Sequence, residues 1–259
     1  MSNSRNLSRF EWDGEPTGHT IPFPTASNQA YMTGSSSEAA ILFIADLFGW
    51  EFRNNRLLAD HLARSVGATV YVPDFFNNDP LPADILTTQD PPWPTLNLTT
   101  YLQSNSRSAR APEILACARH LRAKYPKLGA IGYCYGGWAG LYLASETLNS
   151  GPQPLLDCLT IGHPSLVTEA DIDAVSPRVP VQVLAPEVDA MFTPHLKARA
   201  FRVLQEKGVP FEYSHFPGVE HACFVRGNPG KAGEREAMER GLGAAVGWMG
   251  EWLKRESGE

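Results

Sequence analysis

Short apolar runs alternate with helix-like patterns along most of this chain, and that alternation restricts the possible fold more than any other feature. The runs typical of buried strands cover residues 39–45, 68–72, 127–133, 155–161, 179–185 and 209–214. Apolar residues at helical spacing occupy residues 52–66, 113–121, 135–144, 196–204 and 238–252. Such alternation predicts an α/β fold, with a mostly parallel sheet and helices on both of its faces. The length suits one domain over residues 1–259.

Two stretches depart from this alternation. Residues 1–35 are rich in Ser, Asn, Gly and Thr, so we expect an irregular lead-in with room for a short strand. Residues 74–108 contain five prolines and no sustained periodicity. Loops of this length are uncommon in compact domains unless they serve a purpose such as covering a site. We predict an insertion or lid there, with room for short helical turns.

The amino-acid composition limits the classes of molecule that this protein is expected to bind. The 28 acidic and 22 basic residues give a net charge of −6 without a long run of either sign. We therefore expect a small-molecule ligand and neither a nucleic-acid nor a membrane partner. There is no secretory leader pattern and no apolar run near the ~18 residues of a membrane span. The four cysteines show no metal-like spacing, so we expect reduced thiols, no metal and a cytoplasmic location. A monomer and a homodimer both stay open.

Residues 131–137 read I-G-Y-C-Y-G-G, with Gly132 and Gly136 two residues on either side of Cys134. This is a cysteine version of the nucleophile elbow, in which a strand turns sharply into a helix and glycines permit close backbone approach. A strand-like run precedes the motif, and a helical segment dense in small residues follows it. A helix N-terminus favours the thiolate, so we interpret Cys134 as a nucleophile rather than as a buried structural cysteine.

A cysteine nucleophile needs a base, and the base needs an orienting carboxylate. After a nucleophile elbow, the chain order is acid and then histidine. His221 lies after the last predicted strand and before the final helix, so we assign it as the base. His215 lies within that strand, where a partly buried structural role is the better interpretation. His163 ends an earlier strand and precedes the candidate acid, which breaks the order.

The candidate acid is Asp189, a few residues beyond the strand-like run 179–185. Glu187 is the alternative, but a loop that reaches the histidine needs several residues, which favours Asp189. Backbone N–H groups must hold the oxyanion that forms during acyl transfer. We expect these donors to be Tyr135, directly after the nucleophile, and Leu47, in the loop after the first core strand.

Five sequence blocks together resemble the dienelactone hydrolase family of α/β-hydrolases. They are A-D-L-F-G at 45–49, Y-V-P-D-F-F at 71–76, G-Y-C-Y-G-G at 132–137, E-V-D at 187–189 and G-V-E-H-A-C-F-V-R-G at 218–227. The resemblance implies hydrolysis of a small lactone, ester or thioester through an acyl-cysteine intermediate, without metal or cofactor. The Pro-rich segment and the V-R-G-N-P block at 225–229 resemble the fungal-type branch of the family, which implies secondary metabolism as one setting.

The resemblance also implies roles for two charged residues. Family members often carry a glutamate in the first loop that restrains the resting thiol, and the corresponding residue here is Asp46, one methylene shorter. Arg226 is placed to meet an anionic group of the substrate, with a plain surface arginine as the alternative.

Two other functions compete with a cysteine hydrolase. In the first, a repurposed scaffold acts as a lyase, cyclase or isomerase, with His221 and Asp46 moving protons and no attack by Cys134. In the second, the chain is a non-catalytic binder of a small molecule that kept the pocket. Neither alternative requires the thiol to react.

Overall fold

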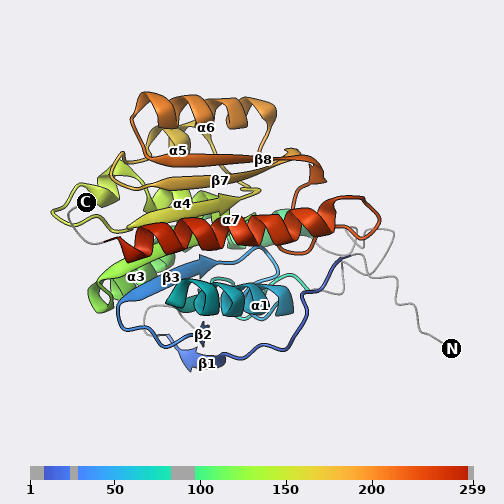
Figure 1. Ribbon diagram of the computed structural model, residues 1–259, viewed down its shortest axis with the longest axis horizontal. Coiled ribbons are helices and arrows are strands. Elements are labelled where there is room, and N and C mark those ends of the chain that lie inside the picture. The colour runs from blue at the N-terminus through green and yellow to red at the C-terminus, as the bar shows by residue number, and fades with distance from the viewer. Residues whose placement is uncertain (1–8, 24–28, 83–96, 256–259) are drawn as a thin grey trace.

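A continuous eight-stranded sheet forms the centre of the computed structural model, which describes residues 9–23, 29–82 and 97–255 (Figure 1). Along the chain the strands are β1 (His19–Pro22), β2 (Gln29–Thr33), β3 (Ala39–Ile44), β4 (Thr69–Pro73), β5 (Lys127–Tyr133), β6 (Cys158–Gly162), β7 (Val181–Val188) and β8 (Phe211–Glu220). Their order across the sheet is β1-β2-β4-β3-β5-β6-β7-β8. β1, β2 and β4 pair antiparallel, and every pairing from β4 to β8 is parallel. The predicted mostly parallel sheet is confirmed.

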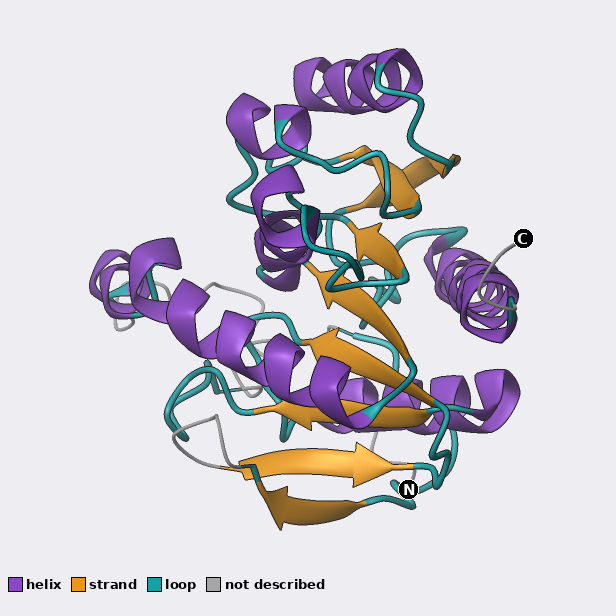
Figure 2. Cartoon of the chain, turned by 90° about the vertical axis from the view of Figure 1, so that its left-hand side faces the viewer, coloured by secondary structure: helices purple, strands orange, loops and turns teal. Residues whose placement is uncertain are grey.

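Helices cover both faces of this sheet, as predicted (Figure 2). The described helices are α1 (Arg53–Leu62), the π-helix η1 (Ala63–Gly67), α2 (Leu98–Ser104), α3 (Arg107–Lys124), α4 (Gly136–Leu143), the 3-10 helix η3 (Glu146–Asn149), α5 (Glu169–Asp173), α6 (Pro194–Glu206) and α7 (Glu234–Lys254). α1 and α7 contribute to one core, whereas α3, α4 and α6 contribute to the other. Within the described ranges, no helix has the length and apolarity to cross a membrane.

The strand β3 shows why an unbroken apolar run is needed in such a sheet. Successive side chains of a strand point to opposite faces. Ala40, Leu42 and Ile44 belong to the core with α3 and α4, and Ile41 and Phe43 belong to the core with α1 and α7. All five are fully buried. A strand that is covered on both faces has no position for a solvated side chain, so the polar residues gather in the loops beyond its end.

The lead-in is more regular than predicted. Instead of at most one short strand, the described parts hold two, β1 and β2, which extend the sheet antiparallel at one edge. Tyr31 in β2 is buried, and its hydroxyl donates to the Asp60 carboxylate in α1 over 2.8 Å. β1 exposes most of its residues to solvent, which explains why its sequence lacks the apolar pattern of the inner strands.

Residues 83–96, the centre of the predicted insertion at 74–108, lie outside the described residues, so the lid stays a prediction. The described parts of this segment are more helical than predicted. α2 begins after Asn97, whose side chain accepts a hydrogen bond from the Thr100 N–H over 3.0 Å. α3 begins at Arg107, earlier than the periodicity from residue 113 indicates. On the other side of the gap, the Leu81 N–H donates to the Leu47 carbonyl over 2.8 Å, which ties this segment to the loop after β3.

Candidate active site

The turn from β5 into α4 places Cys134 at the carboxyl edge of the sheet. Cys134 has φ of 50°, in the left-handed region that is unfavourable for residues with a side chain. A Cβ on Gly132 would lie 2.1 Å from the Gly136 carbonyl oxygen, and one on Gly136 would lie 2.1 Å from that of Ile44. Neither contact is sterically possible, so both positions require glycine. The local geometry is that of a nucleophile elbow.

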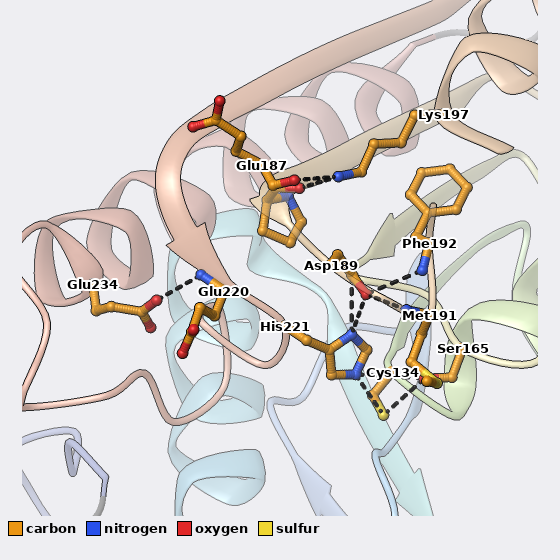
Figure 3. Close-up of polar contacts among 11 residues, drawn as sticks. Cys134, Ser165, Glu187, Asp189, Met191, Phe192, Lys197, Glu220, His221 and Glu234 are labelled. Atoms are coloured by element: carbon orange, nitrogen blue, oxygen red, sulfur yellow. Dashed lines mark hydrogen bonds and ion pairs between the residues drawn. The ribbon is translucent and has the colours of Figure 1, made fainter. Parts of the chain in front are cut away.

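Three loops at this edge bring Cys134, His221 and Asp189 together (Figure 3). His221 directly follows β8, and Asp189 directly follows β7. The His221 Nε2 lies 3.1 Å from the Cys134 Sγ. The His221 Nδ1 lies 2.9 and 3.0 Å from the two carboxylate oxygens of Asp189. The imidazole therefore bridges the thiol and the carboxylate, as the sequence reasoning expected.

The electrostatic interactions of His221 with Asp189 and Cys134 favour a charged imidazole. Burial opposes the protonated form of His221, but the hydrogen bonds to Asp189 and Cys134 outweigh it and raise the pKa of His221 to about 10. Burial also disfavours the Asp189 carboxylate, yet the contact with His221 and the N–H groups of Phe192 and Met191 hold the pKa of Asp189 below its ordinary value. The raised pKa of His221 and the lowered pKa of Asp189 both fit an imidazolium that is held by an ionised carboxylate.

The alternative residues lie elsewhere. Glu187 is exposed, and its carboxylate accepts the Gly218 N–H over 2.7 Å. His215 lies in β8, as predicted, but it is exposed rather than partly buried. His163 is fully buried, with its ring centroid 5.0 Å from that of His221. Within the described residues, neither ring nitrogen of His163 has a hydrogen-bond partner.

The two predicted oxyanion donors lie on neighbouring loops. Ile44 pairs with Gly132 in the parallel register of β3 and β5, so the chain continues from both strands at the same edge. Leu47 follows the first strand and Tyr135 follows the second. In the described part of the chain, neither backbone N–H group has an acceptor. Both predicted donors are thus unpaired among the described residues, and the one on Tyr135 directly follows Cys134 in the turn.

Asp46 is buried beside the site and does not hydrogen-bond the thiol in the part of the chain that the structure describes. Its carboxylate accepts the Asn55 side-chain amide over 3.0 Å and the Phe48 N–H over 3.3 Å. Burial raises the pKa of Asp46, while the amide of Asn55 and the charge of Arg226 oppose that rise. The Arg226 guanidinium lies 5.8 Å from the centre of the Phe48 ring, and no acceptor for its buried Nε is found among the described residues.

Sequence reasoning missed Ser165. Its hydroxyl oxygen lies 3.2 Å from the Cys134 Sγ and 3.4 Å from the His221 Nε2. The available signal was its position, three residues beyond the carboxyl end of β6, because loops at that edge of a parallel sheet converge on the site. No local motif marks it. As for metals, the described ranges contain no group of three His, Cys, Asp or Glu side chains that are arranged to bind one.

The fold, the elbow and the chain order of Cys134, Asp189 and His221 define an α/β-hydrolase. The family model for the dienelactone hydrolase family matches residues 29–253. The chain therefore belongs to the dienelactone hydrolase family, and it is a hydrolase.

Two fungal proteins match most of the chain. It is 29% identical to hydrolase pyvD of Aspergillus violaceofuscus over 229 residues, which covers 87% of this chain and 86% of that protein. It is 27% identical to hydrolase tropI of Talaromyces stipitatus, with 88% and 87% covered. A carboxymethylenebutenolidase homologue of Mus musculus is 34% identical over 114 residues, 42% of this chain and 43% of that protein.

Solved structures agree on the fold. A dienelactone hydrolase from Klebsiella pneumoniae, described as putative, superimposes with a TM-score of 0.67 at 16% identity and covers 91% of this chain and 98% of its own. The dienelactone hydrolase-like phosphotriesterase P91 from metagenomic libraries gives 0.66 at 17% identity, with 92% and 99% covered.

Proposed function

We propose that this protein hydrolyses a small carboxylic ester, lactone or thioester through an acyl-cysteine intermediate on Cys134. The observation that carries this proposal is the continuous contact from the Cys134 thiol through His221 to Asp189. A histidine in contact with both a nucleophile and an orienting carboxylate is the arrangement that activates a thiol for acyl transfer.

The first half of the reaction forms the acyl-enzyme. The thiol proton passes from Sγ to the Nε2 of His221, and the thiolate attacks the carbonyl carbon of the substrate. The N–H groups of Leu47 and Tyr135 hold the resulting oxyanion. His221 then gives its proton to the leaving oxygen or sulfur, and the tetrahedral intermediate collapses to a thioester. Asp189 keeps the imidazole oriented and stabilises its positive charge.

The second half releases the product. His221 accepts a proton from water, the hydroxide attacks the thioester carbon, and the same two N–H groups hold the second oxyanion. Collapse expels the Cys134 sulfur, which regains its proton from His221. The net reaction adds one water across the ester bond, and no other reactant is needed.

The charge near the site bears on substrate choice. Arg226 supplies a cation beside Asp46, with an Nε that finds no acceptor in the described residues. We infer that an anionic group of the substrate meets this guanidinium, since a buried donor such as its Nε is costly to leave without a partner. The match to two fungal hydrolases supports the fungal-type branch. The setting in secondary metabolism and the cytoplasmic location stay predictions from the sequence.

The test compares cysteine variants in turnover of p-nitrophenyl acetate and a panel of enol lactones. Cys134→Ala and Cys134→Ser are expected to lose activity about 10³-fold or more while the fold is retained. Cys158→Ala is the matched control, because Cys158 is a fully buried thiol that contacts Met249 rather than the site.

The variants also separate the competing functions. Retained activity in Cys134→Ala, combined with loss in His221→Ala, would replace acyl transfer by proton-transfer chemistry of a lyase, cyclase or isomerase type. No turnover of any substrate by the folded wild-type protein, with binding of the same compounds, would indicate a non-catalytic binder. An unchanged rate in both cysteine variants contradicts the proposed nucleophile directly.

A further inference from the structure

The loop after β6 is built around the nucleophile. The Cys134 N–H donates to the Gly162 carbonyl over 3.1 Å, and the Ser165 N–H donates to the Cys134 carbonyl over 2.8 Å. Pro164 packs against the first turn of α4. A Cβ added to Gly137 in that turn would lie 2.2 Å from the Cβ of Pro164. These contacts fix the position of Ser165 relative to the thiol without using its side chain.

Strained backbone conformations are concentrated in the loops that form the site. Among the described residues, six that are not glycine have positive φ, and four of them lie in the loops of the site: Cys134, His163, Leu166 and Ala222. Two of these four flank Ser165 within the loop after β6. Such conformations are unfavourable for residues with a side chain and persist where the surroundings impose them. The loop thus holds Ser165 in place at a conformational cost.

The Ser165 hydroxyl is directed at the reacting atoms. Its side chain is shielded, with the residue 7% exposed. Its two hydrogen-bonding contacts are the Cys134 Sγ at 3.2 Å and the His221 Nε2 at 3.4 Å (Figure 3). A protonated His221 has only donors on its ring, so the hydroxyl has one good acceptor left, which is the thiolate. The shorter contact is the one to sulfur.

We propose that Ser165 is a further catalytic residue, whose hydroxyl donates a hydrogen bond to the Cys134 thiolate and stabilises the thiolate–imidazolium pair before substrate arrives. The proton balance is simple: the thiol proton moves to the His221 Nε2, and the Ser165 proton stays on its own oxygen. The thiolate then accepts from two donors, the imidazolium and the hydroxyl. This inference rests on the proposed function of Cys134, and it assigns to Ser165 a contact that Asp46 does not make here.

Alkylation by iodoacetamide tests this without any substrate. The rate of Cys134 modification is followed by intact mass across pH in wild type, Ser165→Ala, Ser165→Thr and the control Ser176→Ala. Ser176 is a buried serine whose hydroxyl accepts a backbone N–H from Arg178, away from the thiol. The other three cysteines are buried, and Cys134→Ala measures any background.

Loss of a donor to a charged acceptor is expected to move the midpoint of the Ser165→Ala profile up by about one pH unit. The thiolate that does form is more basic, so its limiting alkylation rate rises by about threefold at a Brønsted coefficient of ~0.4–0.5. Ser165→Thr keeps the hydroxyl and is expected to stay close to wild type. A merely structural disturbance lowers the limiting rate instead of raising it.

Superimposable profiles of wild type, Ser165→Ala and Ser176→Ala would overturn the inference. So would a lower midpoint in Ser165→Ala, because the hydroxyl would then be restraining the thiol rather than stabilising the thiolate. Either result leaves acyl transfer by Cys134 untouched. Conversely, full turnover by Cys134→Ala would refute the proposed function while the alkylation profiles still report on Ser165.

Discussion

The loop after β6 and the loop after β8 each carry a histidine, and the two rings lie 5.0 Å apart in opposite electrostatic situations. His221 contacts a carboxylate and a thiol, and its pKa is raised to about 10. His163 stacks on Phe224 with an interplanar angle of 12°, and in the described residues neither ring nitrogen has a partner. Burial and the charge of His221 hold the pKa of His163 well below its ordinary value.

The comparison shows that polar partners, and not burial, decide which of the two imidazoles favours its protonated form. Both rings are removed from water, which by itself disfavours the imidazolium. Only His221, in the loop after β8, has a carboxylate on one side of its ring and a thiol on the other. His163 behaves as an aromatic packing residue that supports the face of its neighbour.

Among the predictions, replacement of His221 in the loop after β8 is expected to have the largest effect on activity. His221→Phe keeps an aromatic ring but removes both nitrogens, so the thiol loses its base and Asp189 loses its partner. We expect kcat/KM to fall by about 10⁴-fold. Steady-state hydrolysis of p-nitrophenyl acetate measures it. A loss of less than tenfold would show that the two histidines do not differ in the way described.

The pH dependence of stability gives a second test of the difference between the two histidines. Because the pKa of His221 is about 10 in the folded protein and 6.5 ordinarily, its protonation stabilises the fold fully below about pH 6.5. This contribution is lost as the pH rises through about 10. The difference in Tm between wild type and His221→Phe should therefore shrink between pH 7 and pH 10. A difference that stays constant over that range would contradict the charged pair.

The loop after β8 also depends on a buried carboxylate. Glu234, 1% exposed at the start of α7, accepts the N–H groups of Glu220 and Asn228 over 2.6 and 3.0 Å. Glu234→Gln turns one acceptor into a donor that faces an N–H, so we expect a loss of about 1–3 kcal/mol in denaturant unfolding. Glu236→Gln, on an exposed side chain of the same first turn, is the matched control. Equal midpoints for the two variants would refute this anchoring role.

Replacement of His163 in the loop after β6 is expected to have the smallest effect on activity. His163→Phe preserves the stacked ring and removes nitrogens that have no partner in the described residues, so activity near pH 8 should stay within about threefold of wild type. Because the pKa of His163 is lowered, the wild-type protein loses stability as the pH falls below 6.5, and the variant should lose less. Thermal unfolding at pH 5 and pH 7 measures this. A large loss of activity would give His163 a chemical role.

Much of the fold was predictable because the inner strands are covered on both faces. β5 begins and ends where its apolar run does, and β3 differs from its run by one residue. The edge strand β1 was not predictable, since it is exposed along most of its length and shows no apolar alternation. The early start of α3 was hidden because Pro112, which usually breaks a helix, lies inside it.

The site was predictable to the extent that its chemistry follows chain order. An elbow, a carboxylate after one strand and a histidine after the next are local signals, and the structure brings Cys134, Asp189 and His221 together. Ser165 gave no such signal, because its role depends on the packing of one loop over the first turn of α4. The amide of Asn55 that holds Asp46 lies nine positions away along the chain, and no motif connects the two.

The central claim is that Cys134 carries the acyl group during turnover. Intact-mass spectrometry after brief exposure to p-nitrophenyl acetate, followed by peptide mapping, tests it most directly. The account predicts one acetyl adduct per chain, located on Cys134, absent in Cys134→Ala and lost over time as acetate is released. Turnover by the folded protein without an adduct under rapid quenching, or an adduct on another residue, would contradict it.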